Sequence, residues 1–222
     1  MKNEMNNNVT EMVFILDRSG SMAGLERDTI GGFNAMIEKQ KREEGDALVS
    51  TVLFSNASTV IHDRVELKKI EPLTDKQYYV GGCTALYDAV GDAIHHIGNV
   101  HKYAREEDRP EKTVFVITTD GMENASRRYS AGEVKRLITR QKEKYGWEFL
   151  FLGANIDAQS VADDMGIAED RSACFVNDRR GNALKYEGIS YAMSAVRGKK
   201  CMRSEWKEAM EEDCRVREKG ND

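Results

Sequence analysis

Two uninterrupted apolar runs constrain the fold of this chain more than any other feature. Residues 12–16, Met-Val-Phe-Ile-Leu, and residues 114–117, Val-Phe-Val-Ile, contain no polar side chain. A strand that is apolar on both faces must be covered on both sides, as strands are in a parallel sheet between layers of helices. Asp17 follows the first run and Asp120 follows the second, and each is soon followed by a glycine. The runs therefore predict central strands whose carboxyl ends carry acidic groups.

Strand and helix patterns alternate along the rest of the chain. Strands are expected at about residues 9–16, 48–54, 59–67, 114–119, 148–152 and 173–176. Helices are expected from about residue 25 to 42, at 86–101, at 134–145, around 161–165 and at 184–195. The turn at residues 55–56 is short enough to allow only an antiparallel hairpin, which makes 59–67 an edge strand. The alternation predicts an α/β fold: a doubly wound, mostly parallel six-stranded sheet with one antiparallel edge strand and helices on both faces.

The 222 residues fit one domain with a short extension at each end. Residues 1–8 form a polar N-terminal lead, and residues 9–197 form the predicted domain. Beyond it, residues 198–222 are heavily charged, and we expect a tail that is solvated or partly disordered. Trp206 and Met210 stand four residues apart in this tail, so a short helix is the alternative.

Composition excludes several classes of protein. The 33 basic residues are outnumbered by 38 acidic ones, and the formal net charge of -5 offers no basic surface for nucleic acid. No apolar stretch approaches the roughly 18 residues that a membrane span needs. The polar N-terminus lacks the apolar core of a signal peptide, so we expect a cytoplasmic protein. Four cysteines without CxxC spacing indicate neither a zinc site nor a disulfide framework.

Oxygen-bearing side chains are expected to meet at one edge of this sheet. Asp17, Ser19 and Ser21 alternate in the turn after the first strand, Thr84 lies just before a helix, and Asp120 ends the central strand. Ligand sites of open α/β sheets lie at the carboxyl ends of the strands. Two carboxylates and three hydroxyls are hard oxygen donors of the kind that Mg²⁺ prefers. The sequence therefore predicts a magnesium-type site at this edge.

The charge of this oxygen set indicates what a bound ion would do. Two carboxylates at most balance a divalent cation, so the ion keeps an electrophilic and exchangeable position. That position favours an incoming carboxylate from an Asp or Glu of another protein. Catalysis would also require a base or groups that hold a leaving phosphate. We therefore expect a binding protein and not an enzyme.

Two other functions stay open. One is a metal-dependent hydrolase or phosphotransferase on a similar sheet. A haloacid-dehalogenase-type enzyme would carry a second Asp where this chain has Ser19, and no phosphate-binding loop of the Gly-x-x-x-x-Gly-Lys-Ser/Thr type is present. The other is a metal-independent scaffold, which chelators would not affect.

The chain resembles the von Willebrand factor type A (VWA) domain family, in a stand-alone bacterial form. Residues 17–22, Asp-Arg-Ser-Gly-Ser-Met, look like the family's metal-ion-dependent adhesion site, together with Thr84 in Gly-Gly-Cys-Thr and Asp120 in Thr-Thr-Asp-Gly. The resemblance implies Mg²⁺ or Mn²⁺ held by residues 17, 19, 21 and 84, with Asp120 often acting through water. It also implies a protein ligand that supplies an acidic side chain. Because such bacterial domains accompany AAA ATPases and stress-resistance operons, an AAA ATPase or another operon partner is the implied class.

Other polar residues are expected to play supporting roles. Glu123 and Asn124 follow Asp120 closely, and we interpret them as caps of the next helix or as part of the rim of the site. Residues 127–129, Arg-Arg-Tyr, are expected on a solvated face, where they could steer acidic partners. His95 and His96 project about 100° apart on one helix, which is poor geometry for a shared metal ion.

Overall fold

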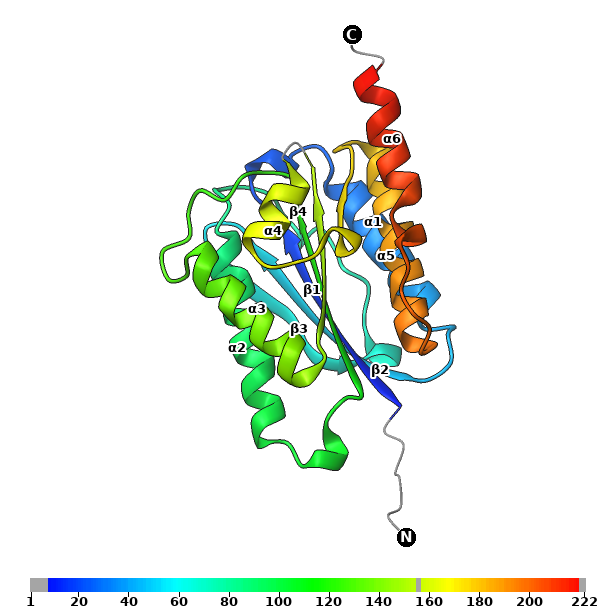
Figure 1. The fold of residues 1–222 in the computed structure, drawn as a ribbon. Coiled ribbons are helices and arrows are strands. Elements are labelled where there is room, and N and C mark those ends of the chain that lie inside the picture. Colours follow the sequence, from blue (N-terminus) through cyan, green and yellow to red (C-terminus); the bar gives the residue numbers. More distant parts are fainter. Residues whose placement is uncertain (1–7, 155–156, 220–222) are drawn as a thin grey trace.

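The computed structural model describes residues 8–154 and 157–219, and these form a central sheet with helices on both faces (Figure 1). Residues 1–7 of the expected polar lead lie outside the described part. The strands are β1 (Val9–Asp17), β2 (Asp46–Phe54), β3 (Ser58–Glu66), β4 (Lys112–Thr119), β5 (Glu148–Gly153) and β6 (Ser172–Cys174). The helices are α1 (Glu26–Gln40), α2 (Leu86–Tyr103), α3 (Ala131–Tyr145), α4 (Ala158–Asp164), α5 (Arg179–Arg197) and α6 (Glu208–Lys219). None of the described helices is long and apolar enough to cross a membrane.

The strand order of the sheet is β3-β2-β1-β4-β5-β6. β1 pairs in parallel with β2 and β4, and the parallel pairing continues through β5 to β6. Only β3 is antiparallel, and it lies at the edge beside β2, as the short turn between the two strands requires. The predicted fold class, a mostly parallel six-stranded sheet with one antiparallel edge strand, is confirmed.

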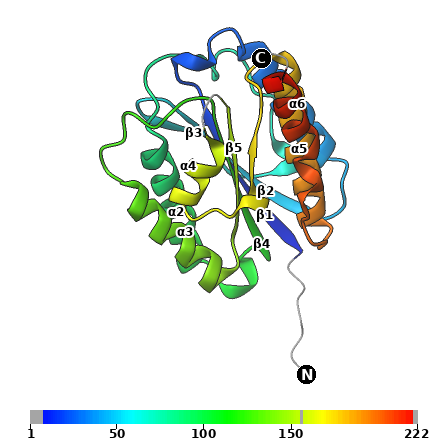
Figure 2. The same ribbon diagram turned by 45° about the horizontal axis from the view of Figure 1, so that its top comes forward.

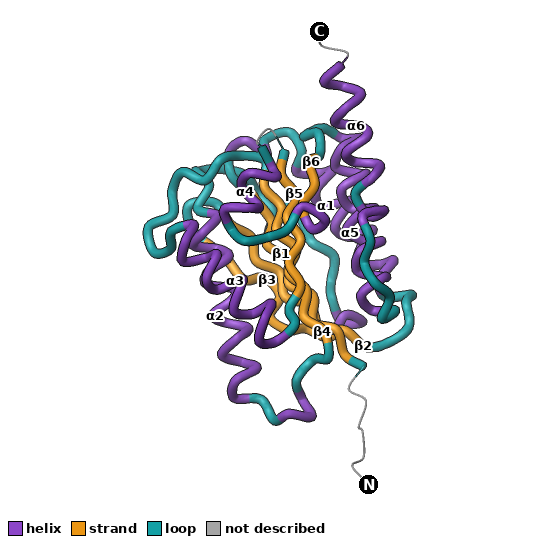
Figure 3. Tube along the Cα trace, in the orientation of Figure 1, coloured by secondary structure: helices purple, strands orange, loops and turns teal. Residues whose placement is uncertain are grey.

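Each face of the sheet packs against its own set of helices (Figure 3). Alternate residues of β1 point to opposite sides, so Met12, Phe14 and Leu16 join the core under α1, α5 and α6. Val13 and Ile15 join the core under α2, α3 and α4. All five side chains are fully buried or nearly so. The apolar runs of the sequence therefore occupy the place that their two apolar faces require.

The pairing of β1 with β4 determines where the acidic groups lie. Leu16 pairs with Thr118, so both strands end at the same level of the sheet. The carboxyl ends of the parallel strands lie at the top in Figure 1, and this end comes forward in Figure 2. Asp17 and Asp120, which belong to strand ends next to each other, are thus placed side by side without any contribution from the loops.

The C-terminal segment differs from the expected solvated tail. Within its described part, α6 packs against α5 and β6, and four apolar side chains of the segment are buried, namely Met202, Trp206, Met210 and Cys214. The Trp206 indole Nε1 donates a hydrogen bond to the carbonyl of Asp170 at 3.1 Å. The expectation of a solvated or partly disordered segment is wrong for these residues, and the alternative of a short helix is correct.

The approach of α6 to α5 depends on Gly188. A Cβ atom at this position would lie 2.5 Å from the carbonyl oxygen of Trp206 and 2.7 Å from the methyl carbon of Met210. No side chain could be added without moving the backbone at Trp206, in the turn just before α6. The burial of Met210 against the backbone of Gly188 explains how α6, although highly charged, is held against α5.

Truncation of Met210 should therefore destabilise the whole domain. We expect Met210→Ala to lower the free energy of unfolding by about 2–4 kcal/mol, because it removes a fully buried side chain and leaves a cavity. Val216→Ala on the same helix is the matched control, since Val216 is 57% exposed and its truncation should change stability by less than about 0.5 kcal/mol. Urea unfolding of both variants tests this. Equal effects would mean that α6 is not packed as described.

Candidate metal site at the carboxyl edge of the sheet

All five predicted site residues lie together at the carboxyl edge of β1 and β4. Asp17, Ser19, Thr84 and Asp120 are buried, each with at most 3% of its surface exposed, and Ser21 is exposed. Two of them end or follow strands, two lie in the turn after β1, and Thr84 lies just before α2. The site is therefore a shallow cluster of oxygen atoms that can be reached from solvent past Ser21.

Asp17 is held in place by three neighbours. Its Oδ1 atom accepts a hydrogen bond from the backbone N–H of Ser19 at 2.7 Å, and its Oδ2 atom accepts one from the Thr119 hydroxyl at 2.6 Å. The Tyr78 hydroxyl donates to the Asp17 carbonyl at 2.6 Å. Thr119 and Tyr78 were not expected at the site. Thr119 could have been found as the residue directly before Asp120, whereas Tyr78 is 61 positions from Asp17 and carries no local signal.

A chain of hydroxyl groups joins the first loop to Asp120. The Ser19 and Ser21 hydroxyl oxygens are 3.0 Å apart, and the Ser21 hydroxyl donates to Asp120 Oδ1 at 2.6 Å. Gly121 lies against the same group: a Cβ atom there would be 3.4 Å from the Ser21 hydroxyl and 3.5 Å from the Thr84 hydroxyl. Gly121 therefore lies in van der Waals range of both hydroxyl groups, which places Ser21 and Thr84 on the same side of the site.

Asn177 is a further neighbour of the site that sequence reasoning missed. It lies in the loop between β6 and α5, and its Nδ2 donates to Asp120 Oδ2 at 2.7 Å. Its own Oδ1 atom is buried and has no hydrogen-bond partner in the described structure. Asn177 and Ser21 thus occupy the two oxygens of Asp120 from opposite loops and fix the plane of the carboxylate.

The two carboxylates repel each other in a poorly solvated place. Burial raises the pKa of Asp120 above its usual range, the hydrogen bond from Ser21 lowers it, and the negative charge of Asp17 raises it again. A divalent cation would offset this repulsion, and hydroxyl and carboxylate oxygens are its preferred ligands. Among the described residues, no group of three or more His, Cys, Asp or Glu side chains could hold a metal ion. The donor chemistry of the mixed carboxylate–hydroxyl cluster therefore fits Mg²⁺ or Mn²⁺ and does not fit zinc.

The turn after β1 is tied to the loop that leads to Thr84. Gly20 N–H donates to the Gly82 carbonyl at 3.0 Å, and Gly81 N–H donates to the Arg18 carbonyl at 2.9 Å. The Arg18 guanidinium lies 4.5 Å from the centre of the Tyr79 ring and donates to the Thr59 hydroxyl of β3 at 2.9 Å. Arg18 therefore braces the edge of the sheet and contributes no charge contact to the carboxylates.

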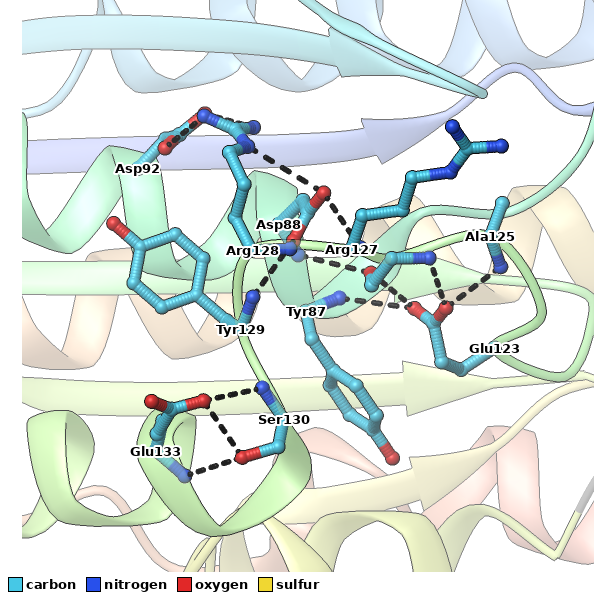
Figure 4. Close-up of polar contacts among 11 residues, drawn as sticks. Tyr87, Asp88, Asp92, Glu123, Ala125, Arg127, Arg128, Tyr129, Ser130 and Glu133 are labelled. Carbon is cyan, nitrogen blue, oxygen red and sulfur yellow. Dashed lines mark hydrogen bonds and ion pairs between the residues drawn. The ribbon is translucent and has the colours of Figure 1, made fainter.

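Glu123 and Asn124 accept hydrogen bonds at the start of α2, the helix before them in the chain; Figure 4 shows the contacts of Glu123. The Glu123 carboxylate accepts hydrogen bonds from the backbone N–H groups of Tyr87, Ala125 and Ser126 at 2.7–3.0 Å. Asn124 Oδ1 accepts one from Thr84 N–H at 2.9 Å. The expectation that these residues cap the following helix is wrong, because α3 is capped by its own pair, Ser130 and Glu133.

Asp88 of α2 in turn accepts hydrogen bonds from the loop after β4 (Figure 4). Its carboxylate accepts the backbone N–H groups of residues 127, 128 and 129 at 2.9–3.0 Å. Burial by itself raises the pKa of Asp88, but these three hydrogen bonds and the Arg128 guanidinium outweigh it and hold the pKa below its usual range. α2 and the loop are thus joined by exchanged caps, which keep Thr84 and Asp120 at a fixed separation.

A hollow of about 520 Å³ adjoins the oxygen cluster. It is lined by Asn56, Cys83, Asp88, Asn124, Ala125, Ser126 and Arg127. Arg128 is held away from it by Asp92, at 2.6–2.7 Å, whereas Arg127 is exposed and forms no ion pair with the residues that the structure describes. The two arginines, both expected on a solvated face, therefore differ in role. Arg128 ties the loop to α2 through Asp92, and Arg127 places a positive charge beside the site.

Replacement of Asp88 should weaken the exchanged caps. We expect Asp88→Asn to lower the free energy of unfolding at neutral pH by about 1–3 kcal/mol, because the loop N–H groups lose a charged acceptor. Since the pKa of Asp88 is lowered in the folded protein, its contribution is present above the ordinary carboxyl pKa of about 4 and is lost as the pH falls through the folded value. Urea unfolding of both proteins at neutral pH and at about pH 3 should show the difference shrinking in acid.

Asp92→Asn is the control for this prediction. Asp92 contacts the same arginine, but its side chain is 37% exposed, so its loss should cost less than about 1 kcal/mol at either pH. An Asp88→Asn effect that is no larger than the Asp92→Asn effect would contradict the role of the exchanged caps.

Comparison with known proteins finds relatives in structure only. No protein-family profile and no curated relative matches the sequence. Proximal thread matrix protein 1 from the mussel byssus is 14% identical, with a TM-score of 0.56 over 84% of this chain and 46% of that chain. A von Willebrand factor type A protein from Catenulispora acidiphila is 12% identical, with a TM-score of 0.56 over 84% of this chain and 42% of that one.

The manganese-loaded TRAP protein of Plasmodium vivax is 16% identical, with a TM-score of 0.55 over 80% of this chain and 72% of that chain. This chain spans less than half the length of the mussel and Catenulispora proteins. Identities this low compare folds and leave activities open. With the strand order and the two helical layers described above, they show that the chain has the fold of a von Willebrand factor type A domain.

Proposed function

We propose that this protein is a divalent-metal-dependent interaction module, which binds an Asp or Glu side chain of a partner protein through Mg²⁺ or Mn²⁺. The ion would be held by Asp17, Ser19, Ser21, Thr84 and Asp120. One observation carries the proposal: three loops bring two buried carboxylates and three hydroxyls to one place, where Ser21 contacts Asp120 at 2.6 Å. A protein of similar fold, TRAP of Plasmodium vivax, is described as manganese-loaded.

The residues of the site supply positioning and charge. Asp17 and Asp120 carry the two negative charges, and their hydrogen bonds to Thr119 and Asn177 hold the carboxylates in fixed planes. The bound ion would supply an electrophilic position open to an outside oxygen ligand. Because two carboxylates do no more than balance the charge of the ion, the ion would keep an electrophilic position that a carboxylate from the partner can occupy.

Binding without catalysis is the function that the surrounding groups favour. Glu123, the nearest additional carboxylate in sequence, accepts hydrogen bonds from three backbone N–H groups and from the Ser126 hydroxyl. Asp88 is occupied in the same way. Neither is available as a general base in this arrangement, which supports a binding module over a hydrolase.

The hollow beside the site indicates how a partner would extend from it. Arg127 lines this hollow and is exposed. A segment that places one acidic residue on the ion and a second near Arg127 would match the charge of the surface. We propose an acidic partner segment of this kind, with an AAA ATPase or another protein from the same operon as the first candidates.

Metal binding should depend on the Thr84 hydroxyl. We expect Thr84→Val, which removes the hydroxyl and keeps the shape, to weaken Mn²⁺ binding by about tenfold or more. Thr113→Val is the control, because Thr113 is equally buried but lies at the opposite end of β4. Calorimetric titration of both variants with Mn²⁺ decides the matter. A wild-type protein that binds neither Mn²⁺ nor Mg²⁺ at millimolar concentration would refute the proposal.

Partner binding should depend on the same ion. We expect a partner captured by the wild-type protein in Mg²⁺ to be lost on addition of a chelator and to be captured poorly by Thr84→Val, because the exchangeable position on the ion would then be missing. Thr113→Val should capture it normally. Pull-down from a lysate of the source cells, with the bound proteins identified by mass spectrometry, provides the measurement. Capture that chelators do not change would favour a metal-independent scaffold.

A further inference from the structure

Lys185 is a buried cation that the proposed metal site does not use directly. It lies in α5 and is 1% exposed. Its Nζ atom donates a hydrogen bond to Asn182 Oδ1 at 2.6 Å and lies 4.6 and 4.7 Å from the ring centres of Phe175 and Tyr186. Among the described residues it has no carboxylate within ion-pair distance. A buried ammonium held by one amide and two rings is unusual, because charge removed from water is generally paired.

The negative charges that act on Lys185 are those of the candidate metal site. The carboxylates of Asp120 and Asp17 both raise its pKa, and its own charge lowers the pKa of Asp120. Burial is the larger effect and lowers the pKa of Lys185 to about 7. α5 begins directly after the loop that carries Asn177, the residue that donates to Asp120. The ring of Phe175, which Lys185 Nζ contacts, belongs to the residue two positions before Asn177. Lys185 is therefore a buried positive charge in the segment that packs next to the site.

We propose that Lys185 tunes the metal site: its ammonium weakens divalent-cation binding at Asp17 and Asp120, and loss of its proton strengthens it. This inference rests on the proposed function, since it assumes a metal ion at the oxygen cluster. A buried positive charge that acts on two carboxylates already offsets part of their charge. A divalent cation entering from the solvent side must then bind against that charge in a poorly solvated environment, where such repulsion is weakly screened.

The proposal gives metal binding a pH dependence whose sign follows from the charges. Below the pKa of Lys185 the ammonium repels the ion, and above it the neutral amine does not. Affinity should therefore rise as the pH rises through this region. The charged groups that act on Lys185 are the carboxylates of Asp120 and Asp17. The phenol of Tyr186, whose ring lies against Nζ, stays neutral over this range because burial raises its pKa.

The test is a titration with Mn²⁺ alone, in which free Mn²⁺ is followed by electron paramagnetic resonance. Wild type and Lys185→Met are compared at about pH 6 and about pH 8.5, on either side of the pKa. We expect the variant to bind Mn²⁺ roughly tenfold more tightly than wild type at the lower pH, and the two proteins to agree at the higher pH. A structural role alone would give no such convergence.

Lys207→Met is the matched control. Lys207 is also buried, but its Nζ atom contacts the carbonyl oxygens of Glu169 and Ser172 and not the site. This variant should keep the wild-type affinity and its rise with pH. Equal affinities of wild type and Lys185→Met at the lower pH would overturn the inference.

Two further outcomes separate this inference from the proposed function. If none of the proteins binds Mn²⁺, the proposed metal site itself is wrong. If Lys185→Met does not fold, the wild-type profile alone decides, because an affinity that does not change between the two pH values would refute a repelling charge at Lys185.

Discussion

The candidate site depends on one constraint, which is the placement of two buried carboxylates at the ends of neighbouring parallel strands. β1 and β4 pair so that they end at the same level, and Asp17 and Asp120 each keep only 2% of their surface exposed. Like charges in such a place are unfavourable unless hydrogen-bond donors or a cation offset them. The surrounding loops are built to do this, and each carboxylate receives two hydrogen bonds from neighbouring groups.

The loop after β4 and the start of α2 are held together by hydrogen bonds in both directions. The first turn of α2 takes its caps from residues 123–126, and the next loop residues, 127–129, give their N–H groups to Asp88 of α2. Each segment satisfies backbone groups that the other leaves open. Because the caps are exchanged, Thr84 and Asp120 cannot separate without exposing several polar groups at once. These hydrogen bonds hold the site residues Thr84 and Asp120 in place although both lie outside helices and strands.

Sequence reasoning could predict the site because its positions follow from periodic elements. The strands are recognisable as apolar runs, and the order of a doubly wound sheet brings Asp17 and Asp120 together. Asn177 has no such signal, since a single amide in a loop is no different from a turn residue. The burial of α6 was missed because Met202, Trp206 and Met210 are spread through a highly charged segment. Trp206 and Met210 pack against the backbone of α5 at Gly188. This packing surface forms only in the folded protein, so the local sequence does not reveal it.

The same C-terminal helix reaches the site through the start of α5. Asp178 caps α5 by accepting the N–H of Gly181 at 2.8 Å, and Arg217 of α6 forms an ion pair with the same carboxylate. Asn177, the neighbour of Asp178, holds Asp120. With Met210 seated over Gly188, α6 contacts α5 both at its middle and at its first turn. Because helix ends are fixed by their caps and by packing, the position of Asn177 depends on α6. The C-terminal helix is therefore part of the framework of the candidate site, although it contributes no ligand to it.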